Sequence, residues 1–188
     1  MAQESHHTAK PKASGKIDTT KWEQLWPQFG VSTFIPNADG LILAGRRKGS
    51  HGAGTWQIPS GKTELAEELS TCAEREPKEE TNLTCHHVKT FAYTNDIFLD
   101  DKKHFLTCFA LCKMEDPHAV PKVMEPEKAE DWAWWKLEDL WAGRVKGTRV
   151  RNSNDPTDKR DGELFLPLFN LFNQVGSLEE LKEMLQLK

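Results

Sequence analysis

Several glutamates and one arginine lie close together in residues 67–81, a stretch whose apolar spacing is typical of an α-helix. If each residue advances about 100° and Leu69 is the origin, Glu76 and Glu80 fall about 20° either side of it, and Glu79 about 80° away. The remaining members of this stripe are apolar, namely Cys72, Ala73 and Pro77. Two carboxylates are therefore expected in the middle of a buried face.

The opposite face is expected to be the solvent side of the helix, and it carries Ser70, Thr71, Glu74, Lys78 and Thr81. Clustered carboxylates on a half-buried face repel one another and are costly to desolvate unless a cation neutralises them. Oxygen ligands suit Mg²⁺ or Mn²⁺, which also bind phosphates. The pattern predicts a metal-activated hydrolytic site; the alternative is a solvated helix whose acids pair with Arg75 and Lys78.

The spacing of the charged residues favours the metal site. Six positions, Gly61, Glu67, Arg75, Glu76, Glu79 and Glu80, match G-x5-E-x7-R-E-U-x-E-E-x-G-U without a gap. This pattern resembles the Nudix box. The flanking segments AGRRKGSHGAGTWQIPSGK and MEPEKAEDWAWWKLEDL are similar to MutT-type nucleoside triphosphate diphosphatases, particularly the MutT-homologue-2 group, over residues 30–142.

Four residues depart from the family pattern near the predicted site. Pro77 replaces an aliphatic residue and removes the amide that would bond the Ala73 carbonyl, at a cost of about 3 kcal/mol or a kink. Asn82 replaces a glycine but tolerates the left-handed conformation that ends many helices. Ser60 and Ala66 stand where the family usually has glycine.

The resemblance implies a role for each matching residue. Glu76, Glu79 and Glu80 would ligate the metal, one of them also acting as base, with the carbonyl of Ser60 as another ligand. Arg75 would orient a glutamate, and Glu67 would support the helix. Glu127 fits the place from which the family supplies an extra carboxylate; the alternative is a solvated loop acid.

Substrate contacts are expected before the box. Arg46, Arg47 and Lys48 precede a loop with Gly49, Gly52 and Gly54, where amides and cations can approach phosphates, unless this is a solvated strand end. Candidates for contact with a nucleobase are Trp56, Gln57 and Ile58, followed by Gly61, although Trp56 is also a natural core residue. The basic loop 144–162 is either a clamp for a highly charged substrate or simply solvated.

The surrounding elements predict an α/β fold, and the resemblance implies a Nudix-type α/β/α sandwich around a mixed β-sheet. Strands are expected at 31–36 and 41–45, joined as a hairpin, and at 88–99, 104–114 and 132–135. Helices are expected at 137–141, at 165–175 and after Ser177, which opens a capping box. Residues 1–20 are expected to be a disordered polar tail, and 21–188 a single domain.

Bulk properties restrict the possible partners. The chain has 188 residues, 29% charged, with a net charge of −4, so it has no overall basic field to attract nucleic acid as a stable partner. Its four cysteines form no close pairs, which favours reduced thiols and a cytoplasmic protein. No apolar run approaches the roughly 20 residues that span a membrane. Related enzymes are often homodimers.

The predicted activity is metal-dependent hydrolysis of a nucleoside triphosphate to a monophosphate and pyrophosphate, with Mg²⁺ or Mn²⁺. The alternative substrates are a dinucleoside polyphosphate, a nucleotide sugar, an RNA cap or an inositol pyrophosphate. A degenerate Nudix domain that binds nucleotide or protein without turnover is the alternative of a different class, because Ser60, Ala66, Pro77 and Asn82 all depart near the site.

Overall fold

The computed structural model describes residues 26–49 and 51–187, so the predicted tail at 1–20 lies outside the described residues. Two β-sheets form the centre of the molecule. The first has the order β4-β1-β6-β5, with β4 at Ser60–Lys62, β1 at Gln28–Phe34, β6 at Lys103–Met114 and β5 at Cys85–Phe98. The second has the order β3-β2-β7, with β3 at Trp56–Gln57, β2 at Ile42–Arg47 and β7 at Ala129–Trp135.

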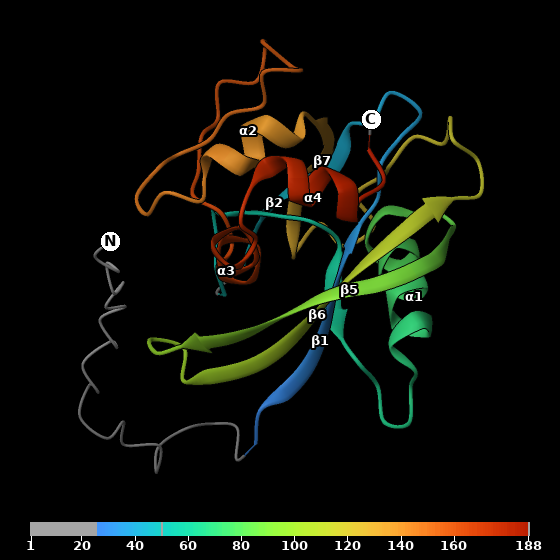
Figure 1. Ribbon diagram of the computed structural model, residues 1–188, viewed down its shortest axis with the longest axis vertical. Helices are drawn as coiled ribbons and strands as arrows, with labels where there is room; N and C mark the ends of the chain where they lie inside the picture. The colour runs from blue at the N-terminus through green and yellow to red at the C-terminus, as the bar shows by residue number, and fades with distance from the viewer. Residues whose placement is uncertain (1–25, 50, 188) are drawn as a thin grey trace, which may run out of the picture.

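Helices cover the first sheet on both sides, which confirms the predicted layers. Strand β1 runs parallel to β6 and antiparallel to β4, so this sheet is mixed as predicted. Helix α1 (Leu69–Thr81) contacts all four of its strands from one side. On the other side lie α2 (Leu137–Ala142), α3 (Leu166–Gln174) and α4 (Leu178–Met184) (Figure 1).

The predicted hairpin at 31–45 is wrong beyond its turn. The turn itself forms: the Asn37 side chain accepts bonds from the amides of Asp39 (3.0 Å) and Leu41 (2.9 Å). After one bridge between Pro36 and Ile42, the two strands separate into different sheets. The physical reason is burial on both faces, because each strand has a run of consecutive buried residues and gains more by pairing inside its own sheet.

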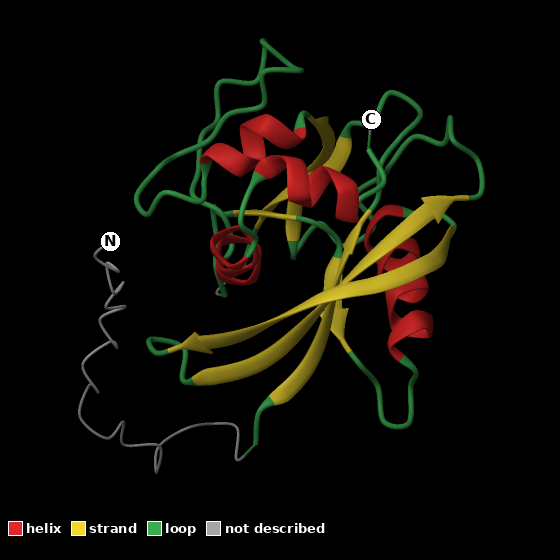
Figure 2. Ribbon diagram, viewed as in Figure 1, coloured by secondary structure: helices red, strands yellow, loops and turns green. Residues whose placement is uncertain are grey.

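Helices lie on both sides of the first sheet (Figure 2), and an apolar core fills the space on each side. One packs the C-terminal helices and the second sheet together, and at its centre Trp56 meets Trp135 edge to face with ring centroids 4.5 Å apart. The other lies under α1 and contains all four cysteines, which are free and buried. Burial raises the pKa of Cys72, Cys85 and Cys112 to about 12, so these thiols stay protonated and unreactive.

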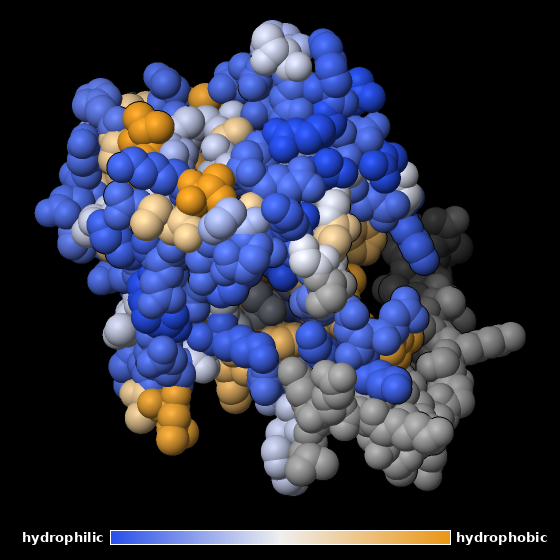
Figure 3. Space-filling model, turned by 180° about the vertical axis from the view of Figure 1, so that it is seen from behind, coloured by the Kyte–Doolittle hydropathy of each residue, from blue (hydrophilic) through white to orange (hydrophobic). Residues whose placement is uncertain are grey.

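The C-terminal helices form as predicted. The Ser177 hydroxyl accepts the Glu180 amide at 3.1 Å, which caps α4, and the Leu181 and Leu185 side chains are buried. No helix among the described residues is both long enough and apolar enough to cross a membrane. The face seen in Figure 3 is mostly hydrophilic, with apolar residues in small separate groups.

Ion pairs engage three of the six cations in the loop 144–162. Arg149 and Arg151 both bind Asp161, and Arg160 binds Asp158 and Asp131. The loop also inserts the buried Asn152, whose amide donates to the Trp134 carbonyl at 3.1 Å. The loop is therefore bound to β7 by these contacts and does not form an open cationic clamp.

Gly45 tests the tight contact between β2 and β7. A Cβ at this position would lie 2.4 Å from the Asp131 carbonyl oxygen and 2.7 Å from the Trp132 ring, so backbone atoms would have to move. We expect Gly45→Ala to lower the free energy of unfolding by about 2–3 kcal/mol in urea titrations. Gly147→Ala is the control, because it meets open space and pays only backbone strain of about 1 kcal/mol; equal losses in the two variants would contradict the crowding.

Candidate active site

The helix that carries the glutamates is bounded by two residues in the left-handed conformation. Ala66 has φ 63° in the turn that precedes α1, which explains why glycine is the usual residue there. Asn82 ends the helix with φ 60° and donates its amide to the Lys78 carbonyl, as its type predicts. The helix begins at Leu69 rather than at 67, so Glu67 belongs to the preceding turn.

Pro77 does not break the helix. Helix α1 runs from Leu69 to Thr81 with Pro77 inside it. One prediction about its faces is wrong, because Thr81 is buried instead of solvent-exposed. Its hydroxyl donates to the Pro77 carbonyl at 2.6 Å and accepts the Leu83 amide at 3.2 Å, which compensates for its burial.

Arg75 is the centre of the charged network. Its Nε and Nη2 bind the two oxygens of Glu67 at 2.7 and 2.9 Å, a bidentate pair. Its Nη1 binds Glu76 at 2.7 Å and Glu79 at 2.9 Å, and Nη2 also donates to the Lys62 carbonyl at 3.0 Å. The bonds from Arg75 hold the pKa of Glu67 at about 2.

Glu76 and Glu80 are buried, with 8% and 5% of their surface exposed. Burial raises the pKa of Glu76, and it raises the pKa of Glu80 to about 8 even though the Ser60 amide donates to Glu80 Oε2 at 3.0 Å and opposes the shift. The negative charge of Glu76 raises the Glu80 pKa further. The protein's own cations therefore do not balance the negative charge that Glu76 and Glu80 would carry if both were ionised.

Strand β4 fits closely against these carboxylates. A Cβ at Gly61 would lie 2.0 Å from the Glu76 carboxyl carbon, so only glycine leaves that carboxylate its place. Strand β1 fixes β4 by pairing Val31 with Gly61 and Ser32 with Ser60. Together they line an open groove of about 400 Å³, with Glu76, Glu79 and Glu80 on one side and Arg47, Lys62 and Lys128 around it.

The predicted substrate residues separate into two groups. Arg47 and Gln57 line the groove, and their side chains bind each other. Arg46 instead binds Glu130 at 3.4 Å, and Lys48 is exposed and lines neither the groove nor the neighbouring cavity.

The two apolar candidates face inward. Trp56 and Ile58 are core residues, 1% and 2% exposed, so the idea that they meet a base directly is corrected. Residues 56 and 58 are two apart and face the same side of the extended chain, so both side chains enter the core that the C-terminal helices cover.

Two acids of the acidic loop, Glu125 and Glu127, have different surroundings. Glu127 is exposed, and its carbonyl oxygen would be 3.4 Å from a Cβ at Gly49. The carboxylate of the loop whose charge raises the pKa of Glu80 is that of Glu125, which binds Lys128 at 2.6 Å. Spacing alone could not separate two acids two residues apart in an irregular loop.

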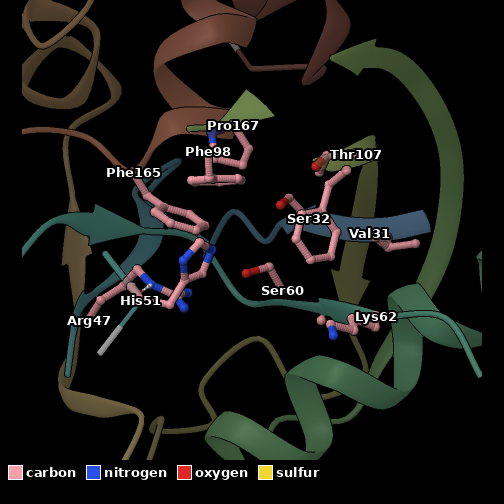
Figure 4. A pocket seen from close by; sticks show the side chains of 13 residues that line it. Val31, Ser32, Arg47, His51, Ser60, Lys62, Phe98, Thr107, Phe165 and Pro167 are labelled. Carbon is pink, nitrogen blue, oxygen red and sulfur yellow. Dashed lines mark hydrogen bonds between the residues drawn. The ribbon is translucent and has the colours of Figure 1, made fainter. Parts of the chain in front are cut away.

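An aromatic cavity next to the groove was missed by the sequence analysis. It has a volume of about 130 Å³, and Phe98, Phe105 and Phe165 contribute its rings (Figure 4). His51 also faces it, with Nδ1 bonded to Asp101 at 2.7 Å. These residues come from three distant segments, so the only signal in the sequence was the pair of phenylalanines flanking the β5–β6 turn.

Solved structures with this arrangement of layers define the class of the fold. The chain resembles a MutT NUDIX hydrolase from Burkholderia pseudomallei, with 26% identity, a TM-score of 0.55, and 60% of this chain and 85% of that chain covered. It also resembles the MutT protein from Methanosarcina mazei Go1, with 21% identity, a TM-score of 0.57 and coverage of 80% and 96%. An ADP-ribose pyrophosphatase from Streptococcus suis shares the fold at 16% identity and a TM-score of 0.51, with coverage of 86% and 91%.

Residues 26–155 match the family model described as the NUDIX domain. The chain belongs to this family and is a MutT-like Nudix hydrolase.

Gly61 allows the site to be disturbed without unfolding the protein. In Gly61→Ala the new methyl group must displace the flexible Glu76 carboxylate, whereas the surrounding backbone can stay in place. We expect hydrolase turnover to fall at least about tenfold, equivalent to about 1.4 kcal/mol in the barrier, with a change in Tm of only a few degrees. Steady-state kinetics and thermal unfolding test this, with Gly147→Ala, remote from the groove, as control; full activity of Gly61→Ala would contradict the close fit.

Proposed function

We propose that the protein hydrolyses a nucleoside triphosphate to a nucleoside monophosphate and pyrophosphate with Mg²⁺ or Mn²⁺ as cofactor. The observation that carries this proposal is the junction of two sites. The groove with its buried carboxylates and the aromatic cavity share Arg47, Ser60, Gly61 and Lys62 in their walls. A ligand with a flat ring and a phosphate chain spans such a pair of sites.

The donor chemistry of the groove fits a hard divalent cation. Glu76, Glu79, Glu80 and the Ser60 carbonyl would hold it, all through oxygen. Within residues 26–49 and 51–187, no three His, Cys, Asp or Glu side chains are arranged to hold a metal ion as they stand. Arg75 and the Ser60 amide already bind one oxygen of each of the three carboxylates. The raised pKa values of Glu76 and Glu80 support the proposal, because these buried acids need a further cation to ionise together.

The bound cation supplies charge neutralisation of the phosphates and a more acidic water. The protein's own residues do the positioning. Arg75 holds Glu76 and Glu79 from behind, and its bidentate bond with Glu67 fixes its guanidinium. One of the groove carboxylates then accepts the proton of the attacking water.

Arg47 lies where the phosphate chain would meet the nucleoside. Its guanidinium carbon is 4.0 Å from the centroid of the Phe165 ring, and its Nε donates to the His51 carbonyl at 2.9 Å. Burial lowers its pKa, yet a guanidinium keeps its proton at neutral pH. Lys62 and Lys128 add positive charge to the rest of the groove.

The aromatic cavity suits a nucleobase. Phe98 and Phe165 stack with centroids 5.4 Å apart and an interplanar angle of 29°, which leaves flat apolar walls. The hydroxyl-bearing residues Ser32 and Thr107 lie in the opposite wall (Figure 4) and can bond the edge of a base.

Glu80→Gln tests the catalytic proposal. The amide is nearly isosteric and cannot ionise, so the buried position stays neutral and the protein keeps its stability, while the anionic form that would bind a cation is lost. We expect Mg²⁺-dependent turnover to fall at least about a hundredfold, which corresponds to about 2.7 kcal/mol, at an unchanged Tm. Glu74→Gln is the matched control, because Glu74 is a half-buried acid of the same helix that does not line the groove and accepts the His87 amide at 2.7 Å. Undiminished turnover in Glu80→Gln would rule out the proposed site.

Phe165→Ala tests the location of the base. Loss of one stacking partner costs about 1–3 kcal/mol per base, so KM should rise about tenfold while kcat changes little. Leu99→Ala is the control, because this apolar side chain is exposed in the β5–β6 turn and does not line the cavity. An unchanged KM in Phe165→Ala, with the protein folded by circular dichroism, would place the base elsewhere.

A further inference from the structure

Pro77 leaves one carbonyl of the catalytic helix without its usual partner. In a regular α-helix the amide of residue 77 would bond the carbonyl of residue 73, but proline has no N–H. Ala73 is fully buried, so water cannot replace the missing donor. A buried carbonyl without a partner costs about 1–3 kcal/mol, yet α1 continues through this turn.

Two side chains from the sheet bond this carbonyl. Thr33 Oγ1 donates to the Ala73 oxygen at 3.3 Å, and Cys112 Sγ donates to it at 3.5 Å. Both donors are fully buried, and they come from the neighbouring parallel strands β1 and β6. Each group needs the other as a partner, because a buried Thr33 hydroxyl without a hydrogen bond would be as costly as the buried Ala73 carbonyl without one.

The position of this contact matters for the groove. Glu76 and Glu80 lie one and two turns further along the same face of α1. Both carboxylates are fitted against β4, because Glu76 packs against Gly61 and Glu80 accepts the Ser60 amide. Strand β1 also holds β4 in register, so the strand that supplies Thr33 also places Ser60 and Gly61.

We propose that Thr33 is a positioning residue for the catalytic glutamates: its hydroxyl, assisted by the Cys112 thiol, replaces the helix bond that Pro77 removes and fixes α1 against β4. The simpler alternative is that Thr33 only fills the core. The two differ in one respect. A filling role is independent of residue 77, whereas the replacement role exists only while residue 77 lacks an amide.

A double-mutant cycle separates these roles. Thr33→Val removes the hydroxyl at nearly constant volume, Thr33→Ser keeps it, and Pro77→Ala restores the amide. In the Pro77 background we expect Thr33→Val to lower kcat about tenfold, which corresponds to about 1.4 kcal/mol, to leave KM within about twofold, and to lower Tm by about 4 °C. Thr33→Ser should keep most of kcat. In the Pro77→Ala background, Thr33→Val should change kcat less than about twofold and Tm by no more than about 1 °C.

Equal losses in the two backgrounds, or a Thr33→Ser variant as impaired as Thr33→Val, would overturn the proposal. The kcat and KM measurements of this cycle rest on the proposed hydrolysis. The independent readout is therefore Mn²⁺ affinity, measured by titration of the protein with the metal alone. Weaker Mn²⁺ binding in Thr33→Val when Pro77 is present, but not in the Pro77→Ala background, supports positioning even if no nucleotide in a panel is cleaved. A loss of Tm without change in Mn²⁺ affinity or kcat would reduce Thr33 to a structural residue and overturn it. If Thr33→Val does not fold, Cys112→Ala in the same two backgrounds repeats the test on the second donor.

Discussion

The forked contact of Arg75 with Glu67, Glu76 and Glu79 is the interaction on which the site depends. Carboxylates this close repel one another, and a single guanidinium bound to all three holds them together, with Glu76 and Glu79 in the wall of the groove. The same guanidinium bonds the Lys62 carbonyl, so α1 and β4 are tied together at the point where the groove opens. The arrangement still leaves Glu76 and Glu80 short of positive charge. This shortage of positive charge supports the proposed metal-dependent chemistry.

Helix α1 can hold its carboxylates in place only because the sheet beneath it is rigid. Strand β1 is paired on both sides, and its Thr33 hydroxyl bonds the helix. In β4, Gly61 has no side chain and so leaves space for the Glu76 carboxylate. The departures from the family pattern at Ala66, Pro77 and Asn82 are each accommodated by a local solution, namely two left-handed residues and one replaced hydrogen bond. They do not remove a carboxylate or Arg75.

Most strands and helices could be predicted from the sequence, because their apolar periodicities are long and their turns carry clear signals. Local patterns also placed the glutamates on the inner face of α1, and two of them, Glu76 and Glu80, are buried. What failed depended on distant contacts. The separation of β1 from β2 and the burial of Thr81 are decided by what packs against these residues. The aromatic cavity joins three segments far apart in the chain, so local spacing could indicate only the two phenylalanines that flank the β5–β6 turn.

Product analysis over a panel of nucleotides tests the central claim most directly. The purified protein is incubated with canonical and modified nucleoside triphosphates, a dinucleoside polyphosphate, ADP-ribose and capped RNA, each with Mg²⁺, with Mn²⁺ and with chelator, and pyrophosphate and phosphate are measured separately. Our account predicts metal-dependent release of pyrophosphate, with a nucleoside monophosphate as the other product, from at least one triphosphate. Silence across the panel from a folded protein, or turnover that persists in chelator, would contradict it.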